Sequence, residues 1–221
     1  MSLTVCGARL VAGCDDGTLK CWVLDSLAKQ CICTFRAHSE RIGTLLSLPG
    51  GVMASGAADD CVKIWAVQEW GEEEALAGAP RALHTLHEHS DSVVSLAHSG
   101  RFLLSGGCDR TICVWDGARA WEFVLALPGH SSPVLALASL PPAASPAAPE
   151  GGVVSADRAT VRVWDASTWT CTLVVPTELG CITSLSVLDG HLLAATDRTL
   201  QVLEMREWGV RQTLAVAEAQ G

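Results

Sequence analysis

SGGCDRTICVWD, residues 105–116, is the stretch that decides the fold, because recognisable copies of it run along the whole 221-residue chain. The other copies are AGCDDGTLKCWV at 12–23, SGAADDCVKIWA at 55–66, SADRATVRVWD at 155–165 and AATDRTLQVLE at 194–204. A Trp fills the same position in four copies and Leu203 fills it in the fifth, at successive distances of 43, 50, 49 and 39 residues. Such a period indicates a supersecondary unit that buries its faces by stacking against its neighbours.

Each copy predicts a strand, a tight turn and a second strand. A run of small residues ends the first strand, an Asp beside Gly, Arg or Asp makes the turn, and an alternating apolar run such as TICVW makes the next strand. The Asp stands six residues before the Trp position in four copies, and in the copy at 155–165 it comes one place early, at Asp157.

With this period and these motifs the chain resembles the WD-repeat proteins, a family of β-propellers with four-stranded blades. Three copies also follow the histidine that the family carries before the first strand of a blade: His38, His89 and His130. The resemblance implies an all-β fold in which residues 1–221 form a single propeller domain with five blades. Their approximate ranges are 1–36, 37–87, 88–128, 129–176 and 177–218.

The number of blades leaves the closure of the propeller open, because WD-repeat propellers usually close with about seven blades. Three arrangements stay open: a five-bladed ring, an incomplete part of a larger propeller, and a ring completed by another chain. We expect the incomplete form, because the histidine of the first blade would have to precede Met1. The free sides of the first and last blades would then be apolar surfaces that need a cover.

Composition narrows the class of partner. The net charge is −9, with only 15 Lys and Arg, which argues against nucleic acid because phosphate binding needs clustered cations. No apolar run approaches the roughly 20 residues of a membrane helix, and the opening MSLTVCGARL lacks a secretory signal. We therefore expect no membrane partner and an intracellular protein, with the cytoplasm favoured over the nucleus.

The ten cysteines are expected to be reduced thiols in core and turn positions.

The resemblance also implies a buried hydrogen-bond network in each blade, formed by His, Asp and Trp with a Ser or Thr. The members would be His38, Asp59 and Trp65, then His89, Asp109 and Trp115, then His130, Asp157 and Trp164, with Asp16, Trp22 and Asp197 at the matching places of the first and last copies. The position of the hydroxyl stays open, because the residue two before the Asp is Cys14, Ala57, Gly107 or Ala195 and never Ser. Ser55 and Ser105 stand close by in the sequence.

Two other interpretations of these residues are set aside. A catalytic Ser-His-Asp triad occurs once per enzyme and not once per blade. A metal site at His84, His87 and His89 has no specific spacing, and His89 already holds a repeat position. We expect no catalytic residue, no metal ligand and no cofactor.

A second periodic signal is a Trp five or six residues after the strand-ending position: Trp70, Trp121, Trp169 and Trp208. We interpret these rings as packing the turn against its own or the next blade, with a recurring aromatic contact site as the alternative.

Insertions are predicted at Gln68 to Pro80 and at Pro141 to Gly152 as surface loops. The composition of the second, PPAASPAAPEGG, predicts a flexible or extended spacer with nothing to bury.

The resemblance implies a non-enzymatic protein-interaction scaffold or adaptor, a class that includes substrate recognition in ubiquitin ligases. The alternative is a truncated form or structural subunit whose propeller other blades complete. The resemblance implies that partners would be proteins bound at the face that carries the turns between second and third strands and the loops that lead from the fourth strand of one blade into the first strand of the next. The residues that match this face are Asp15, Arg41, Ser92, Pro133 and Thr183.

Overall fold

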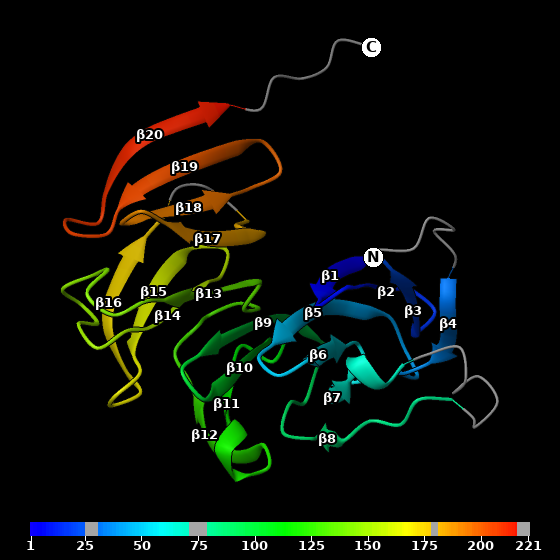
Figure 1. Cartoon of the computed structure of the whole chain (residues 1–221). Helices are drawn as coiled ribbons and strands as arrows, with labels where there is room; N and C mark the ends of the chain where they lie inside the picture. Colours follow the sequence, from blue (N-terminus) through cyan, green and yellow to red (C-terminus); the bar gives the residue numbers. More distant parts are fainter. Residues whose placement is uncertain (25–30, 71–78, 178–180, 216–221) are drawn as a thin grey trace, which may run out of the picture.

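The computed structural model describes residues 1–24, 31–70, 79–177 and 181–215, and this part of the chain forms five four-stranded antiparallel sheets (Figure 1). In every sheet the strands follow one another in chain order, so each sheet is a meander. We number the sheets as blades one to five and call their successive strands a, b, c and d.

The strand bounds are as follows. Blade one holds β1 (Ser2–Cys6), β2 (Arg9–Gly13), β3 (Thr18–Val23) and β4 (Cys31–Arg36). Blade two holds β5 (Ile42–Leu48), β6 (Val52–Ala57), β7 (Val62–Ala66) and β8 (His84–Leu86). Blade three holds β9 (Val93–Ser99), β10 (Phe102–Gly107), β11 (Ile112–Asp116) and β12 (Glu122–Leu127). Blade four holds β13 (Ala136–Leu140), β14 (Gly152–Ala156), β15 (Thr160–Asp165) and β16 (Thr170–Pro176). Blade five holds β17 (Ser184–Leu188), β18 (His191–Ala195), β19 (Thr199–Glu204) and β20 (Gly209–Ala215).

The blades stand side by side in an arc, with strand a of each blade beside strand a of the next. Figure 1 shows that the arc stays open between blade one, in blue, and blade five, in orange and red. Across the described residues the five sheets therefore do not close into a ring. The all-β propeller architecture and the five blades are confirmed, and a closed five-bladed ring is wrong.

Four apolar clusters hold the arc together, one between each pair of neighbouring blades. The cluster between blades three and four is typical, since it joins Leu104 and Ile112 of one sheet to Leu137 and Val153 of the other. In blade three the inner strand β11 is buried on both of its faces, which explains why it reads as an almost continuous apolar run.

The tight turns between strands b and c form as the sequence predicts. In blade three, Asp109 accepts hydrogen bonds from Thr111 N (3.0 Å) and Thr111 Oγ1 (2.8 Å), and Arg110 takes a positive φ of 70°. In blade one the corresponding turn contains Gly17, with φ of 81°. A Cβ at Gly17 would lie 2.3 Å from the carbonyl oxygen of His38, so only glycine fits there.

The second periodic set of Trp residues joins each blade to the one before it. Trp70 is buried with its ring 5.2 Å from that of Phe35 in blade one, and Trp169 of blade four lies 5.1 Å from Phe102 of blade three. Trp121 and Trp208 pack on the clusters between blades two and three and between blades four and five. Packing on the same blade is confirmed for Trp70, whose ring lies 6.1 Å from that of Trp65, but the neighbouring blade that Trp70 and Trp169 contact is the preceding one and not the next.

The segment 141–152 is not a free spacer, and that prediction is wrong. Ser145 and Ala148 are fully or almost fully buried, and an isolated β-bridge joins them. Trp208 Nε1 of blade five donates to Ser145 Oγ (3.2 Å), which in turn donates to the carbonyl oxygen of Met205 (3.2 Å). Alanine side chains are small enough for this loop to pack closely on blade five. The other insertion, Gln68 to Pro80, falls largely on residues 71–78, outside the described residues.

Candidate functional site

Blade three contains a buried chain of four hydrogen-bonded side chains. His89 Nδ1 lies 2.8 Å from Asp109 Oδ2 and His89 Nε2 lies 2.8 Å from Ser105 Oγ. Trp115 Nε1 donates to the same Ser105 Oγ over 2.9 Å. A neutral imidazole that donates from Nδ1 to the carboxylate and accepts from the serine at Nε2 satisfies every one of these contacts.

Blade two repeats the same chain with Asp59, His38, Ser55 and Trp65. His38 Nδ1 lies 2.9 Å from Asp59 Oδ1, Ser55 Oγ donates to His38 Nε2 over 2.7 Å, and Trp65 Nε1 donates to Ser55 Oγ over 2.9 Å.

Blade four has the same members with one weaker contact. Ser155 Oγ donates to His130 Nε2 (2.6 Å) and Trp164 Nε1 donates to Ser155 Oγ (2.8 Å). His130 Nδ1 lies 3.0 Å from Asp157 Oδ2, an ion-pair distance without hydrogen-bond alignment. The turn is one residue shorter here, since Ser155 precedes its Trp by nine residues and Ser105 precedes its Trp by ten.

The three serines are the network members that the sequence left unassigned. The register between strands b and c identifies them, because Leu103 pairs with Trp115 and Ser105 lies two residues further along the same strand face. In blades one and five the same position holds Ala12 and Ala194. Counting from the Trp position, instead of from the Asp, would have found the serine.

Electrostatics favour a neutral histidine beside an ionised carboxylate. Burial lowers the pKa of His38 and His130, and their Asp neighbours only partly offset this effect. Burial raises the pKa of Asp109, but hydrogen bonds from Thr111, Ser90 and His89 outweigh it and leave that pKa below its ordinary value. Asp59 and Asp157 show the same net lowering.

The network is structural and not a reaction centre. Ser55, Ser105 and Ser155 are fully buried, and each hydroxyl is held between an imidazole and an indole. A substrate cannot reach these oxygens, so they cannot act as nucleophiles.

The residues assigned to this network in the first and last blades behave differently. Asp16 accepts only from Thr18, at N (3.0 Å) and Oγ1 (2.7 Å), and Trp22 is half-buried. The exposed Asp197 lies 3.7 Å from Arg198, and its turn is closed by Thr196, which accepts from Thr199 N (3.0 Å). Among the described residues neither Asp contacts a histidine, so these two copies have the Asp of the repeat without the His contact of blades two to four. The expected histidine region of blade five, Leu179-Gly180, lies outside the described residues.

Each network carboxylate also fixes the loop that leads into strand a. Asp59 Oδ2 accepts from Ser39 N (3.0 Å), Asp109 Oδ2 from Ser90 N (3.0 Å) and Asp157 Oδ2 from Ser131 N (3.2 Å). One carboxylate therefore ties this loop to the b–c turn of the same blade. These are the segments that the sequence assigned to a partner face.

The candidate partner-face residues lie at this end of successive blades. Asp15 is exposed, 3.7 Å from Arg41 Nε and 3.6 Å from the N-terminal amine. The carbonyl oxygens of Arg41 and Ser92 accept from the b–c turns of their own blades, at Ala58 N and Cys108 N. Pro133 is half-buried in the loop that leads into strand a of blade four, and Thr183 Oγ1 donates to the carbonyl oxygen of Ala195 (3.3 Å). All five residues lie on the face of the arc that carries the b–c turns, one in each of the five blades.

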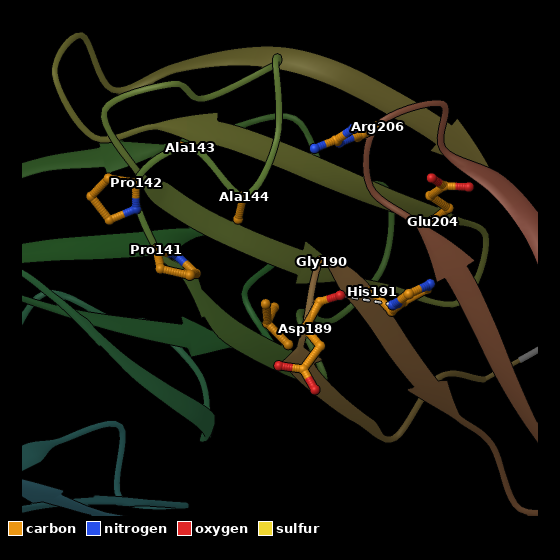
Figure 2. A pocket seen from close by; sticks show the side chains of 10 residues that line it. Pro141, Pro142, Ala143, Ala144, Asp189, Gly190, His191, Glu204 and Arg206 are labelled. Carbon is orange, nitrogen blue, oxygen red and sulfur yellow. Dashed lines mark hydrogen bonds between the residues drawn. The ribbon is translucent and has the colours of Figure 1, made fainter.

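The opposite face of the arc, which carries the a–b loops, has a cavity of about 570 Å³ between the a–b loop of blade four and blade five. Figure 2 shows Pro141 and Pro142 on one side and Asp189, His191 and Glu204 on the other, with His191 Nδ1 donating to the carbonyl oxygen of Asp189 (2.9 Å). Its mixed charges and open shape do not select one ligand chemistry.

The described part of the chain holds no group of three or more His, Cys, Asp or Glu side chains arranged for a metal ion. His89 belongs to the network, and His87 Nδ1 lies 3.1 Å from Cys61 Sγ. Among the described residues, no helix has the length and apolar character needed to cross a membrane.

Comparisons with known proteins agree with this geometry. The family described as "WD domain, G-beta repeat" matches residues 1–23, 29–66 and 80–116. The Nuclear distribution protein PAC1 of Gibberella zeae is 36% identical over 126 residues, which cover 54% of this chain and 25% of that protein. The Serine-threonine kinase receptor-associated protein of Gallus gallus is 26% identical over 196 residues, or 88% of this chain and 51% of that protein. The matched region thus spans between about a quarter and a half of these relatives.

Proposed function

The chain is a WD-repeat protein, and we propose that it acts as a non-enzymatic protein-interaction module, a scaffold or adaptor. The observation that carries this proposal is the double role of Asp59, Asp109 and Asp157. Each holds a b–c turn and the loop into strand a together. Loops that are already ordered lose little conformational entropy on binding, so short contacts can give useful affinity.

Two finer statements belong to the same proposal. Substrate recognition in a ubiquitin ligase is one adaptor role, and the resemblance to the family is its only support. A cytoplasmic location is supported by the ten cysteines, none of which forms a disulfide in the structure. Thiols persist in reducing compartments, whereas secreted proteins of this size usually oxidise them.

A paired-variant binding experiment tests the interaction role. Asp15→Lys with Arg41→Glu reverses two exposed charges at the partner face, and Arg206→Glu reverses an exposed charge at the opposite end as the matched control. We expect proteins captured by the wild type to be lost with the first variant and kept with the control. Equal capture by all three chains, with each variant folded, would contradict the assignment of the face.

A second candidate function is supported by the free sides of the arc: a structural subunit whose propeller is completed by further blades. The last residue of strand a shows why. Leu140 in blade four is 2% exposed beneath blade five, whereas its equivalent in blade five, Leu188, is 58% exposed. The same difference in exposure is found in strand d, where Leu127 of blade three is 2% exposed and its equivalent in blade five, Leu214, is 45% exposed.

Blade one presents the complementary side. Leu10 and Trp22 of blade one are equivalent to Leu103 and Trp115 of blade three. The two residues of blade three are buried, whereas Leu10 and Trp22 are half-buried. Together with Met1, Leu3 and Leu24 they line an apolar groove of about 450 Å³. The two ends of the arc are thus the two halves of the interface that recurs inside it, and each fits a blade of the same repeat type.

Sedimentation measurements over a range of concentrations test this candidate. We expect the wild type to associate, and Leu188→Asp with Leu214→Asp to reduce that association because both charges enter the free side. Val174→Asp, at a position 43% exposed on β16, is the control. A wild type that remains monomeric throughout would remove the support for completion by further blades.

A further inference from the structure

Strands β3 and β4 place two cysteines directly opposite each other. Cys21 pairs with Cys33 in the register of blade one, and these are the only cysteines that oppose one another in the sheets of the described residues. Opposed Cα atoms in an antiparallel pair lie about 4.5–5.5 Å apart. Disulfide-bonded cysteines have Cα separations of about 4.4–6.8 Å, which neighbouring strands already provide.

The third thiol nearby is placed differently. The register shifts between Cys21 and Trp22, so Cys31 stands opposite Trp22 and not opposite Cys21. Cys31 Sγ instead donates to the carbonyl oxygen of Cys33 over 3.2 Å and lies 3.4 Å from Thr34 Oγ1. Cys31 is therefore a matched control, two residues from Cys33 on the same strand but out of register with Cys21.

The two opposed thiols differ in access. Cys21 is fully buried in the cluster between blades one and two, and Cys33 is half-buried against the same cluster. Cys33 is the more exposed of the two residues, so we expect an oxidant from solvent to react with it before Cys21.

The chemistry of Cys21 suits a second, resolving thiol. A hydrogen bond from Cys33 lowers the pKa of the Cys21 thiol, and the nearby Arg9 guanidinium adds to this effect, together outweighing burial. Once Cys33 has reacted it no longer donates to Cys21, and the nearby Arg9 guanidinium is the group that still favours the Cys21 thiolate for its attack.

We propose that Cys21 and Cys33 form a reversible modification site, a cross-strand disulfide made with a low-molecular-weight disulfide such as oxidised glutathione as the oxidant. The Cys33 thiolate attacks one glutathione sulfur; a mixed S–S bond forms, the glutathione S–S bond breaks and the first glutathione leaves as a thiolate. The Cys21 thiolate then attacks the Cys33 sulfur, and the second glutathione leaves. The protein loses two electrons, the oxidant gains them, and the two protons end on the two glutathione thiols.

The proposed disulfide would link the edge strand β4 covalently to its neighbour β3. β4 is the outermost strand of blade one, and its Phe35 contacts Trp65 and Trp70 of blade two. A disulfide from β3 to β4 closes the loop of residues 21–33 and restricts the unfolded chain. The oxidised protein is therefore expected to melt a few degrees higher than the reduced protein.

Equilibration of the full chain in glutathione buffers of increasing oxidised fraction tests the proposal. Trypsin cleaves after Lys20, Lys29 and Arg36, so Cys21 falls in peptide 21–29 and Cys33 in peptide 30–36. We expect a linked pair of these peptides, about 2 Da lighter than their sum, that disappears on return to reduced glutathione. Cys31→Ser should retain the link and the rise in melting temperature, and Cys33→Ser should lose both.

Two results would contradict the proposed Cys21–Cys33 disulfide. One is complete alkylation of Cys21 and Cys33 in the wild type at the most oxidised buffer. The other is a linked pair that survives in Cys33→Ser and vanishes in Cys31→Ser. Should Cys33→Ser fail to fold, peptide mapping of Cys31→Ser alone still decides, because it leaves only Cys33 in peptide 30–36.

Discussion

Blade three and blade five have the same strand order but different interiors. In blade three, Ser105, His89 and Trp115 form a buried polar chain, and every residue of β11 is buried. In blade five, Ala194 and Leu203 occupy the serine and tryptophan positions, and the other residues of β19, the strand equivalent to β11, are only half-buried. Leu203 itself is still buried, so the inner part of blade five packs without the network.

Blade five has lost the serine and the tryptophan together, whereas blade one keeps a half-buried Trp22 with Ala12 in the serine position. A buried indole N–H or imidazole without its serine would cost about 1–3 kcal/mol, whereas replacing both partners by apolar groups can be nearly neutral. In blade five both partners are replaced by apolar residues, with Ala194 in the serine position and Leu203 in the tryptophan position. The fold of a blade therefore requires the strand pattern, and the network adds stability and fixed loops.

The largest expected effect comes from breaking the network at its centre. Ser105→Ala removes the hydroxyl that serves both His89 Nε2 and Trp115 Nε1, and both ring nitrogens remain buried. We expect a loss of about 3 kcal/mol in the free energy of unfolding, measured by urea denaturation.

Ser184→Ala is the control for this change, because Ser184 is exposed on blade five. It should alter the free energy of unfolding by less than about 0.5 kcal/mol. A loss of the same size in both variants would show that Ser105 contributes no more than a surface serine.

A double-mutant cycle turns blade three toward the composition of blade five. Trp115→Phe removes the indole N–H that Ser105 accepts and keeps an apolar ring. We expect Ser105→Ala with Trp115→Phe to cost about 1–2 kcal/mol less than the sum of the single changes, because the double variant leaves no indole N–H unpaired. Additive costs, from the same urea measurements, would mean that the two side chains are not coupled.

The pH dependence of stability offers a third test. Burial lowers the pKa of His38 and His130 below 6.5, so the unfolded chain binds protons first as the pH falls. Stability is therefore complete above about pH 6.5 and falls below it, by at most about 1.4 kcal/mol per pH unit for each histidine. The lowered pKa of Asp59 and Asp109 adds a further loss below about pH 4, where the unfolded carboxylates protonate first.

Urea midpoints at pH 7 and pH 5 measure this effect. His130→Asn should show a smaller difference between the two than the wild type, and His191→Asn, outside the network, should match the wild type. An unchanged difference in His130→Asn would assign the acid sensitivity to other groups.

The sequence was sufficient for the repeat, the strand pattern and the Asp turns, because these are local. The period of the Trp positions and the alternating run of 111–115 depend only on neighbours along the chain. The serines needed the pairing of two strands, since Ser105 is recognised by lying two residues from the partner of Trp115. Likewise the side on which Trp70 and Trp169 pack depends on how blades stack, which no single repeat encodes.

The loop of blade four shows the limit of composition. Proline and alanine predicted a spacer, because such residues offer little apolar area to bury. In the structure, β-turns bring Ser145 and Ala148 together beneath Trp208, and the partner that makes burial possible lies 63 residues further along the chain. Tertiary contact thus overrides composition where small side chains allow a close approach.

The smallest expected effect tests this loop. Ser145→Ala removes one hydroxyl that accepts from Trp208 Nε1 and donates to the carbonyl oxygen of Met205, and the half-buried indole can turn to water. We expect a loss of about 0.5–1 kcal/mol in the free energy of unfolding. Hydrogen exchange should show faster opening of blade five than of blade three, because only blade five shares this contact. Ser167→Ala, on the exposed c–d turn of blade four, is the control, and equal exchange in the two variants would mean that the loop does not hold blade five.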